Sequence, residues 1–226
     1  MSTTVVISPV AASGVAGSAI LPLALVVGTG LWAAARAIAA QDETCAKLLA
    51  KSREDLRRER LAMLELRSAD LGRLTRSALE ARFQATSLPG GAVRLAEGSR
   101  VPVWAARTAD GIQLMGEEAS LRRLLVANTA SRAVEHLRSR GFQVETGRMR
   151  TGETALVGRP GAGQGVEVVI GSSGEAHVDL TGFRGKECER VARDLATAIE
   201  GTITSFCPKP EYYGGAAVKV GETERA

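Results

Sequence analysis

The stretch from Gly182 to Gly201 constrains the fold more than any other part of this chain, because it combines a strand end, a glycine turn and a helix. Gly182 and Gly185 bracket Phe183, and glycine permits a tight strand-to-helix turn that a side chain would obstruct. After the turn, apolar residues recur with the spacing of one helix face. They are Cys188, Val191, Leu195, Ala198 and Ile199. The segment therefore predicts an α+β module in which Cys188 is a small buried hydrophobe.

The start of this helix also has a functional interpretation. N–H groups at a helix start bind anions, and Arg184 and Lys186 flank Gly185 at that point. A plain capping turn fits the same residues. Cys188 has an alternative too, as a thiolate activated by the helix start and by Lys186. We expect a structural motif of Gly182, Phe183, Gly185 and Cys188, with Arg184, Gly185 and Lys186 as candidate anion-binding residues.

Alternating strand patterns precede the motif. Residues 166–170 and 176–180 predict a hairpin, and residues 142–145 and 153–157 predict two more strands. A helix is predicted over residues 117–140, with a glycine at its C-terminal end. Residues 117–213 thus predict a small antiparallel-sheet module with two packed helices.

Residues 1–35 carry no charged side chain. Within them, residues 15–35 have about the length that a transmembrane helix needs. Arg36 and Lys47 follow, so the positive-inside rule places the bulk of the chain in the cytoplasm. Glycines and a proline weaken such a helix, and the alternative is a cytoplasmic protein that buries this segment in an oligomer. We expect residues 1–40 to form a hydrophobic N-terminal segment, with its helix over residues 15–35.

Residues 41–88 predict one long amphipathic helix. Strong helix formers dominate the segment, and Leu49, Leu56 and Met63 recur every seven residues, as in a coiled coil. The helix would pack against another copy or fold back on its own domain. Pro89 marks its end.

Residues 89–116 predict a small β-hairpin region. Its strands are expected over residues 92–97, 100–107 and 111–116, with Trp104 as the side chain that anchors this sheet.

Composition excludes several kinds of function. The 29 basic residues face 25 acidic ones, and the two signs alternate over residues 53–82, which is typical of a solvated helix face rather than a nucleic-acid patch. The three cysteines and the two histidines, His136 and His177, form no zinc-binding pattern. The glycine-rich run 158–165 lacks the ending of a P-loop. We expect no enzyme activity, no cofactor, no metal site and no nucleic-acid partner.

The segment 165–213 resembles DUF2997, a family of short bacterial proteins of unknown function. The shared features are the strand hairpin, Gly182-Phe183, Gly185, Cys188, Leu195, Ala198, Gly201 and the ending Lys209-Pro210-Glu211-Tyr212-Tyr213. This resemblance implies an accessory component that works with an AAA-type ATPase. Residues 121–170 resemble, more loosely, a second small family first seen in chloroplast genomes.

The ending offers a candidate contact surface. Lys209, Pro210, Glu211, Tyr212 and Tyr213 combine an extended backbone with two aromatic rings, a format suited to docking into a groove. The alternative is that the two tyrosines cover the edge of their own domain. Residues 214–226 predict a flexible tail.

Together these features predict a non-enzymatic, membrane-associated and homo-oligomeric adaptor, whose C-terminal α+β module binds protein partners such as an AAA-type ATPase. The alternative is a structural subunit of a large soluble homo-oligomeric assembly, with the apolar N-terminus buried between copies.

Overall fold

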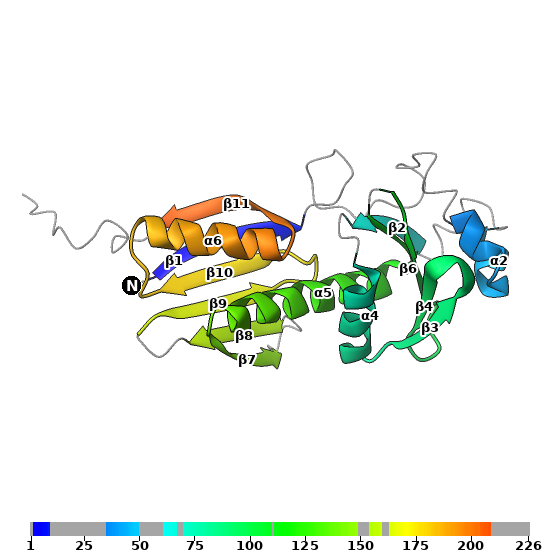
Figure 1. Cartoon of the computed structure of the whole chain (residues 1–226), viewed down its shortest axis with the longest axis horizontal. Coiled ribbons are helices and arrows are strands. Elements are labelled where there is room, and N and C mark those ends of the chain that lie inside the picture. Colours follow the sequence, from blue (N-terminus) through cyan, green and yellow to red (C-terminus); the bar gives the residue numbers. More distant parts are fainter. Residues whose placement is uncertain are drawn as a thin grey trace, which may run out of the picture.

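The computed structural model describes residues 2–9, 35–49, 61–66, 70–109, 111–148, 154–159 and 163–208. These residues form two antiparallel sheets with helices packed on them, so the predicted α+β class is confirmed. The sheets lie one after the other along the long axis, and α5 runs from one to the other (Figure 1).

The strands are β1 (Ser2–Pro9), β2 (Leu61–Leu66), β3 (Gln84–Leu88), β4 (Ala92–Ala96), β5 (Val103–Arg107), β6 (Ile112–Glu117), β7 (Gln143–Arg148), β8 (Thr154–Arg159), β9 (Gly165–Ile170), β10 (Ala176–Thr181) and β11 (Gly201–Pro208). The helices are α2 (Glu43–Leu49), α4 (Leu71–Glu80), the 3-10 turn η1 (Pro89–Gly91), α5 (Glu118–Ser139) and α6 (Lys186–Ala198).

The six-stranded lobe consists of the sheet β11-β1-β10-β9-β8-β7 with α6 and the second half of α5. Its core takes alternate residues from each strand, because successive side chains of a strand point to opposite faces. Val168, Ile170 and Val178 are fully buried in this core, together with Leu195 of α6. The predicted hairpin of 166–170 with 176–180 is present as β9 and β10, and the predicted final helix is present as α6.

The hydrophobic N-terminal segment predicted over residues 1–40 begins with a strand that we did not expect. β1 lies between β10 and β11 and pairs antiparallel with both. Thr3, Val5 and Ile7 point into the core of the six-stranded lobe, with exposed fractions of 2%, 0% and 0%. Alternate side chains of a strand point to the same face, and here that face is apolar enough to be buried in a sheet. This pattern explains why the segment forms a strand.

Most of the predicted span, residues 15–34, lies outside the described residues. Among the helices that are described, none is long and apolar enough to cross a membrane. β1 pairs within the six-stranded lobe, whereas residues 35–49 pack on the five-stranded sheet, and α5 joins the two.

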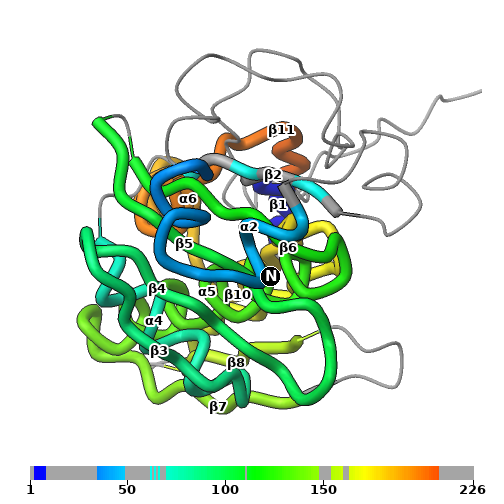
Figure 2. The backbone as a smooth tube through the Cα atoms, turned by 90° about the vertical axis from the view of Figure 1, so that its right-hand side faces the viewer, coloured from blue at the N-terminus to red at the C-terminus, as the bar shows by residue number. Residues whose placement is uncertain are grey.

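The five-stranded lobe consists of the sheet β2-β6-β5-β4-β3 between two helical layers. α4 and the first half of α5 cover one face, over a core that includes Leu95 and Leu114. The helical residues 35–39 and α2 cover the other face, where Trp104 is fully buried. Seen along the long axis, the helical residues 35–39 and α2 lie in front of this sheet (Figure 2).

The predicted long helix over residues 41–88 is wrong. The described part of this segment contains α2, β2, α4 and β3. Leu61–Leu66 has good helix formers, but it pairs with β6, so that Leu64 lies opposite Leu114. Tertiary pairing therefore overrides helix propensity. α4 is a separate short helix, because Asp70 caps its start by accepting a hydrogen bond from the Arg73 N–H at 2.9 Å.

The predicted strands of residues 89–116 are present as β4, β5 and β6. They belong to a larger sheet than the hairpin region that we expected, since β3 extends it on one side and β2 on the other. Trp104 anchors this sheet as predicted.

Helix α5 links the two lobes. It has 22 residues, matching the predicted helix over residues 117–140. Leu121 and Leu124 lie in the core of the five-stranded lobe, and Ala133 and Leu137 lie in the core of the six-stranded lobe. One continuous helix therefore contributes to both cores and fixes the lobes relative to each other.

Candidate functional site

The glycine turn before α6 is a close backbone contact. Gly182 has φ +81, and a Cβ on it would meet the Gly163 carbonyl oxygen and lie 2.9 Å from the Gln164 Cα. Only glycine fits there without a shift, so the turn packs directly on the chain that enters β9. Phe183 is buried and stacks on Phe142, with ring centroids 6.5 Å apart. These residues thus position α6 on the sheet.

Cys188 lies on the buried face of α6. Its thiol has no exposed surface, and the Thr3 hydroxyl of β1 donates to its sulfur at 3.7 Å. Burial raises the pKa of the Cys188 thiol, and the nearby charges of Glu187 and Glu189 raise the pKa further. A raised pKa leaves less thiolate at neutral pH. This environment matches the small buried hydrophobe that we expected and disfavours an activated nucleophile.

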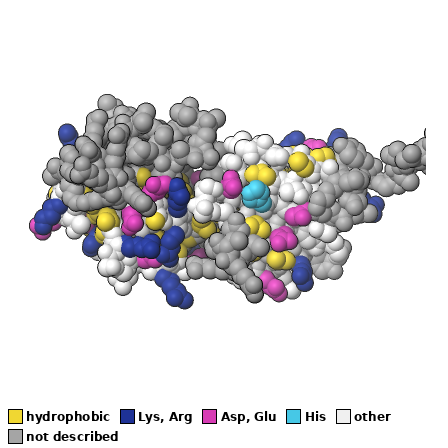
Figure 3. All heavy atoms as spheres, turned by 180° about the vertical axis from the view of Figure 1, so that it is seen from behind, with side chains coloured by type: hydrophobic (Ala, Val, Ile, Leu, Met, Phe, Trp, Pro, Cys, Tyr) yellow, Lys and Arg dark blue, Asp and Glu magenta, His cyan; other side chains and the backbone are white. Residues whose placement is uncertain are grey.

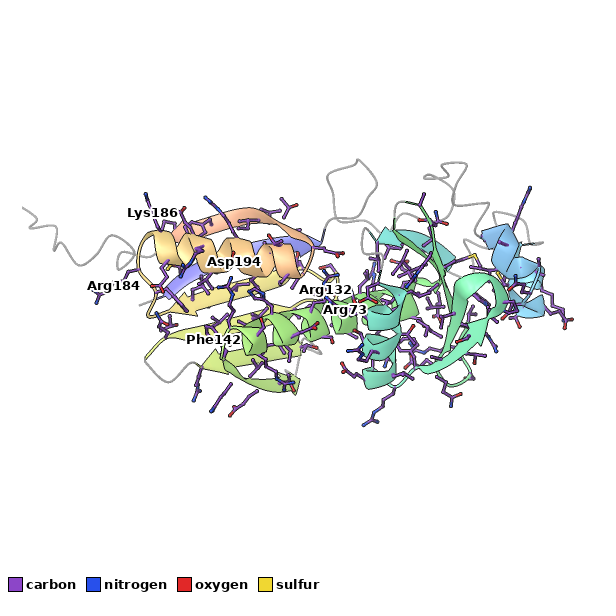
Figure 4. All side chains as sticks on the ribbon, in the orientation of Figure 1. Arg73, Arg132, Phe142, Arg184, Lys186 and Asp194 are labelled. Atoms are coloured by element: carbon purple, nitrogen blue, oxygen red, sulfur yellow. The ribbon has the colours of Figure 1, made fainter. Side chains whose placement is uncertain are left out.

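The candidate anion-binding residues lie at the outer end of the six-stranded lobe. Arg184 and Lys186 are exposed and project away from the sheet (Figure 4). Gly185 precedes the helix with φ 48 and offers no side-chain cap. The first turn carries Glu187 and Glu189, which place negative charge beside the N–H groups that an anion would approach. Anion binding here stays a prediction.

The predicted contact segment Lys209–Tyr213 lies outside the described residues. The strand that leads into it, β11, forms one edge of the six-stranded sheet, and β1 is its neighbour. Side chains of β11 are half-buried or exposed along its whole length. Among the described strands, β11 is thus an edge strand, and it ends where this segment begins.

A cleft of about 740 Å³ lies between the lobes, beside the start of α5. Its charged lining residues include Arg122 and Arg123. Arg122 forms an ion pair with Glu118, and Arg123 pairs with Glu97. Basic and acidic side chains also lie interspersed over the five-stranded lobe on the face shown in Figure 3. The described arginines of the cleft are neutralised by neighbouring carboxylates, so the cleft lacks the strong positive field that attracts anions.

The two histidines lie on separate elements, His136 on α5 and His177 on β10. His177 is about half exposed and lies 3.4 Å from Glu175. His136 is half-buried on α5, and burial lowers its pKa, helped by the charge of Arg140. Among the described residues, no group of three or more His, Cys, Asp or Glu could hold a metal ion.

A buried carboxylate, which sequence reasoning missed, organises the outer face of the five-stranded lobe. Asp42 caps α2 by accepting from the Cys45 N–H at 3.0 Å, and its other oxygen accepts from the Trp104 indole N–H at 3.1 Å. Arg94 lies 3.5 Å from the same oxygen. Burial alone would raise the pKa of Asp42, but these hydrogen bonds and the arginine hold that pKa below its usual value. An aspartate before an apolar helical turn is a recognisable cap signal.

Residues 166–213 match the model of the family described as "Protein of unknown function (DUF2997)". The match confirms the resemblance of the C-terminal segment, and it spans most of β9 together with β10, α6 and β11. No curated protein matches the chain, and no solved structure matches it.

β1 is the strand of the six-stranded sheet that sequence reasoning missed. It lies between β10 and β11, which both belong to the segment that matches the family model, although β1 comes from the other end of the chain. The alternation of Thr3, Val5 and Ile7 was the available signal, since apolar and half-exposed positions alternate there as in a strand.

Proposed function

We propose that this chain is a non-enzymatic adaptor, which binds a protein partner along the outer edge of β11 and through the residues that follow it, Lys209–Tyr213. The observation that carries the proposal is the position of β11 in its sheet together with its uncharged sequence. It is the last strand of its sheet, and its eight residues, Gly201–Pro208, include no charged side chain.

An edge strand of this kind is a template for strand addition. The outer side of an edge strand presents backbone N–H and C=O groups that can pair with another extended chain. Sheet edges are usually blunted by charged side chains, and lysine is the commonest of these. Thr202, Ser205 and Cys207 are all exposed on β11, yet all are uncharged. This edge therefore suits a partner segment that adds as a seventh strand.

The segment after β11 would extend the same contact. Tyr212 and Tyr213 follow the end of β11 after three intervening residues, so their rings would reach a partner that is already paired with β11. Aromatic residues supply large contact area at low entropic cost and are enriched in interface cores. The partner that we propose is an AAA-type ATPase, which the family resemblance implies.

The experiment is a pull-down with the full chain from its own cells, with mass spectrometry of the recovered proteins. The test variant carries Thr202→Lys and Ser205→Lys on β11. The matched control carries Gln143→Lys and Thr146→Lys on β7, the opposite edge of the same sheet, where both residues are exposed. We expect the β11 variant to reduce recovery of an ATPase at least tenfold, a loss of about 1.4 kcal/mol. Equal recovery with both variants would contradict the proposal.

Tyr212→Ala with Tyr213→Ala tests the second half of the contact. We expect a similar loss of recovery, because the two rings would form the apolar part of the interface. Unchanged recovery would instead support the alternative that these tyrosines cover their own domain.

The membrane-associated location stays a prediction, with the C-terminal bulk in the cytoplasm. Fractionation of cells that express the full chain tests it. Recovery of the intact chain without detergent, in the same fractions as a variant lacking residues 10–34, would contradict an anchoring role.

A further inference from the structure

The segment that matches the family model is not a continuous sheet by itself. β10 and β11 are separated in sequence only by the turn and α6, but they are not neighbours in the six-stranded sheet. β1 lies between them and is antiparallel to both. Residues 166–208 therefore leave a slot one strand wide, and a strand from the start of the chain fills it.

β1 repeats β9 on the other side of β10. Val5 and Val168 both lie opposite Val178, and Ile7 and Ile170 both lie opposite Ala176. The two strands run in the same direction, and each carries the tripeptide Val-Val-Ile in the same register. The slot thus selects an uncharged strand with branched apolar side chains at alternate positions.

The far wall of the slot is also shaped for β1. A Cβ on Gly201 of β11 would collide with the Ile7 side chain and lie 3.0 Å from the Ser8 carbonyl oxygen. At the other end of the strand, the Thr3 hydroxyl reaches the Cys188 sulfur of α6. These contacts fix the position of the strand along the slot as well as its orientation.

We propose that the slot between β10 and β11 is a strand-binding site, which also receives the N-terminal strand of a second copy of this chain, so that two copies exchange β1 reciprocally. The main contacts of β1 are with β10, β11 and α6, all within the six-stranded lobe. A strand from another copy makes the same contacts, so exchange adds little cost in the folded state.

Chain length permits the exchange. Residues 10–34 join β1 to the next described segment, and a chain of that length reaches at most about 90 Å. When a strand is tethered to its own slot, its effective concentration is on the order of millimolar. At low protein concentration, each chain therefore fills its slot with its own β1. Exchanged dimers form when chains fold at a protein concentration comparable to this effective concentration.

The experiment uses two full-length chains, both with Cys207→Ser to remove the exposed thiol. One chain carries Thr3→Cys and Cys188→Ala, and the other keeps Thr3 and Cys188. The new thiol at position 3 takes the place of a hydroxyl that lies 3.7 Å from the Cys188 sulfur. A disulfide between these positions in this mixture can form only between two chains. Val6→Cys replaces Thr3→Cys in the control, because residue 6 points to the opposite face of the strand.

We expect refolding of the mixture near 1 mM to give an interchain disulfide and a dimer mass by light scattering, at least tenfold more than refolding near 1 μM. The Val6→Cys control gives neither product with Cys188. A separate chain with Thr3→Cys and Cys188 intact forms the disulfide within itself when dilute. Monomer mass without interchain disulfide at 1 mM overturns the proposal. Failure of the single chain to form any disulfide between these positions overturns it as well, since β1 would then not occupy the slot.

Discussion

Arg132 of α5 and Glu200, which lies in the turn between α6 and β11, form an ion pair of 2.7 Å. The Arg132 side chain is 8% exposed, and its Nε also donates to the Ala198 carbonyl at 2.7 Å. This carbonyl belongs to the last residue of α6, where a helix leaves acceptors unsatisfied and carries partial negative charge. The arginine thus joins the helix that links both lobes to the end of α6, beside the edge strand (Figure 4).

The first prediction concerns this arginine. Arg132→Ala removes the donor to a helix-end carbonyl and the partner of Glu200, so we expect a loss of about 2–3 kcal/mol in the free energy of unfolding. The control is Arg73→Ala, whose pair with Glu135 is exposed and should contribute under about 1 kcal/mol. Urea denaturation measures both variants, and equal losses would contradict a special role for Arg132.

The second prediction concerns the glycine turn. Gly182→Ala should destabilise the fold by more than Gly141→Ala, although both glycines have nearly the same φ, +81 and +83. At position 141 a Cβ meets nothing within 4 Å, so the cost is that of the left-handed backbone alone, about 1 kcal/mol. At position 182 the Cβ meets backbone atoms, and we expect at least about 2 kcal/mol. Thermal unfolding of both variants gives the comparison, and similar midpoints would exclude the close contact.

The third prediction concerns Asp42 and pH. A carboxylate whose folded pKa is depressed contributes stability above its unfolded pKa and loses it as pH falls through the folded value. We therefore expect Asp42→Asn to lower stability at pH 7 by about 1–3 kcal/mol. It should also weaken the decline of stability below pH 4. Denaturation curves from pH 3 to pH 7 test both effects. A variant with an unchanged acid slope would show that Asp42 does not titrate in this range.

The fourth prediction concerns the thiols. Cys207 is exposed, whereas Cys45 and Cys188 are buried. Burial raises the pKa of Cys45 from 9.0 to about 12, helped by the charge of Asp42, which lowers its thiolate fraction about a thousandfold at neutral pH. Iodoacetamide at pH 7.5 should therefore label Cys207 first in the native chain, with mass spectrometry as the readout. Rapid native labelling of Cys188 would contradict its buried position.

The raised pKa values of these two buried thiols also predict that the folded state loses stability at alkaline pH. An acid whose folded pKa is raised stays protonated in the folded state after the unfolded chain has lost its proton. Stability should accordingly fall as pH rises above about 9. Cys45→Ala should reduce this fall, and an unchanged slope between pH 8 and pH 10 would contradict the linkage.

The C-terminal half of the fold could be predicted because its signals are local. β9 and β10 alternate in hydropathy and meet at a short glycine-containing turn, and α6 shows its buried face at helical spacing. Such elements need no knowledge of distant residues. The buried position of Cys188 followed from the same spacing.

Residues 1–88 could not be predicted in the same way, because several of their described elements depend on distant partners. Leu61–Leu66 has a helical composition but becomes a strand through its pairing with β6. β1 needs β10 and β11, which are made of residues far along the chain. In the sequence, Arg132 is one of several charged residues of α5. Its burial depends on the packing of α6 against this helix, which the sequence does not show. The cap by Asp42 and the alternation of Thr3, Val5 and Ile7 are local signals of this region that could have been recognised.

The place of β1 in the sheet sets an order of events during synthesis. β1 leaves the ribosome well before β10 and β11, the two strands that enclose it. At about 5–20 residues per second, this delay is roughly ten to forty seconds. During that interval the uncharged strand lacks the two strands that it pairs with, so the six-stranded sheet can close only after β11 has been synthesised. Faster elongation or a chaperone that shields the nascent N-terminus should therefore raise the yield of folded chain.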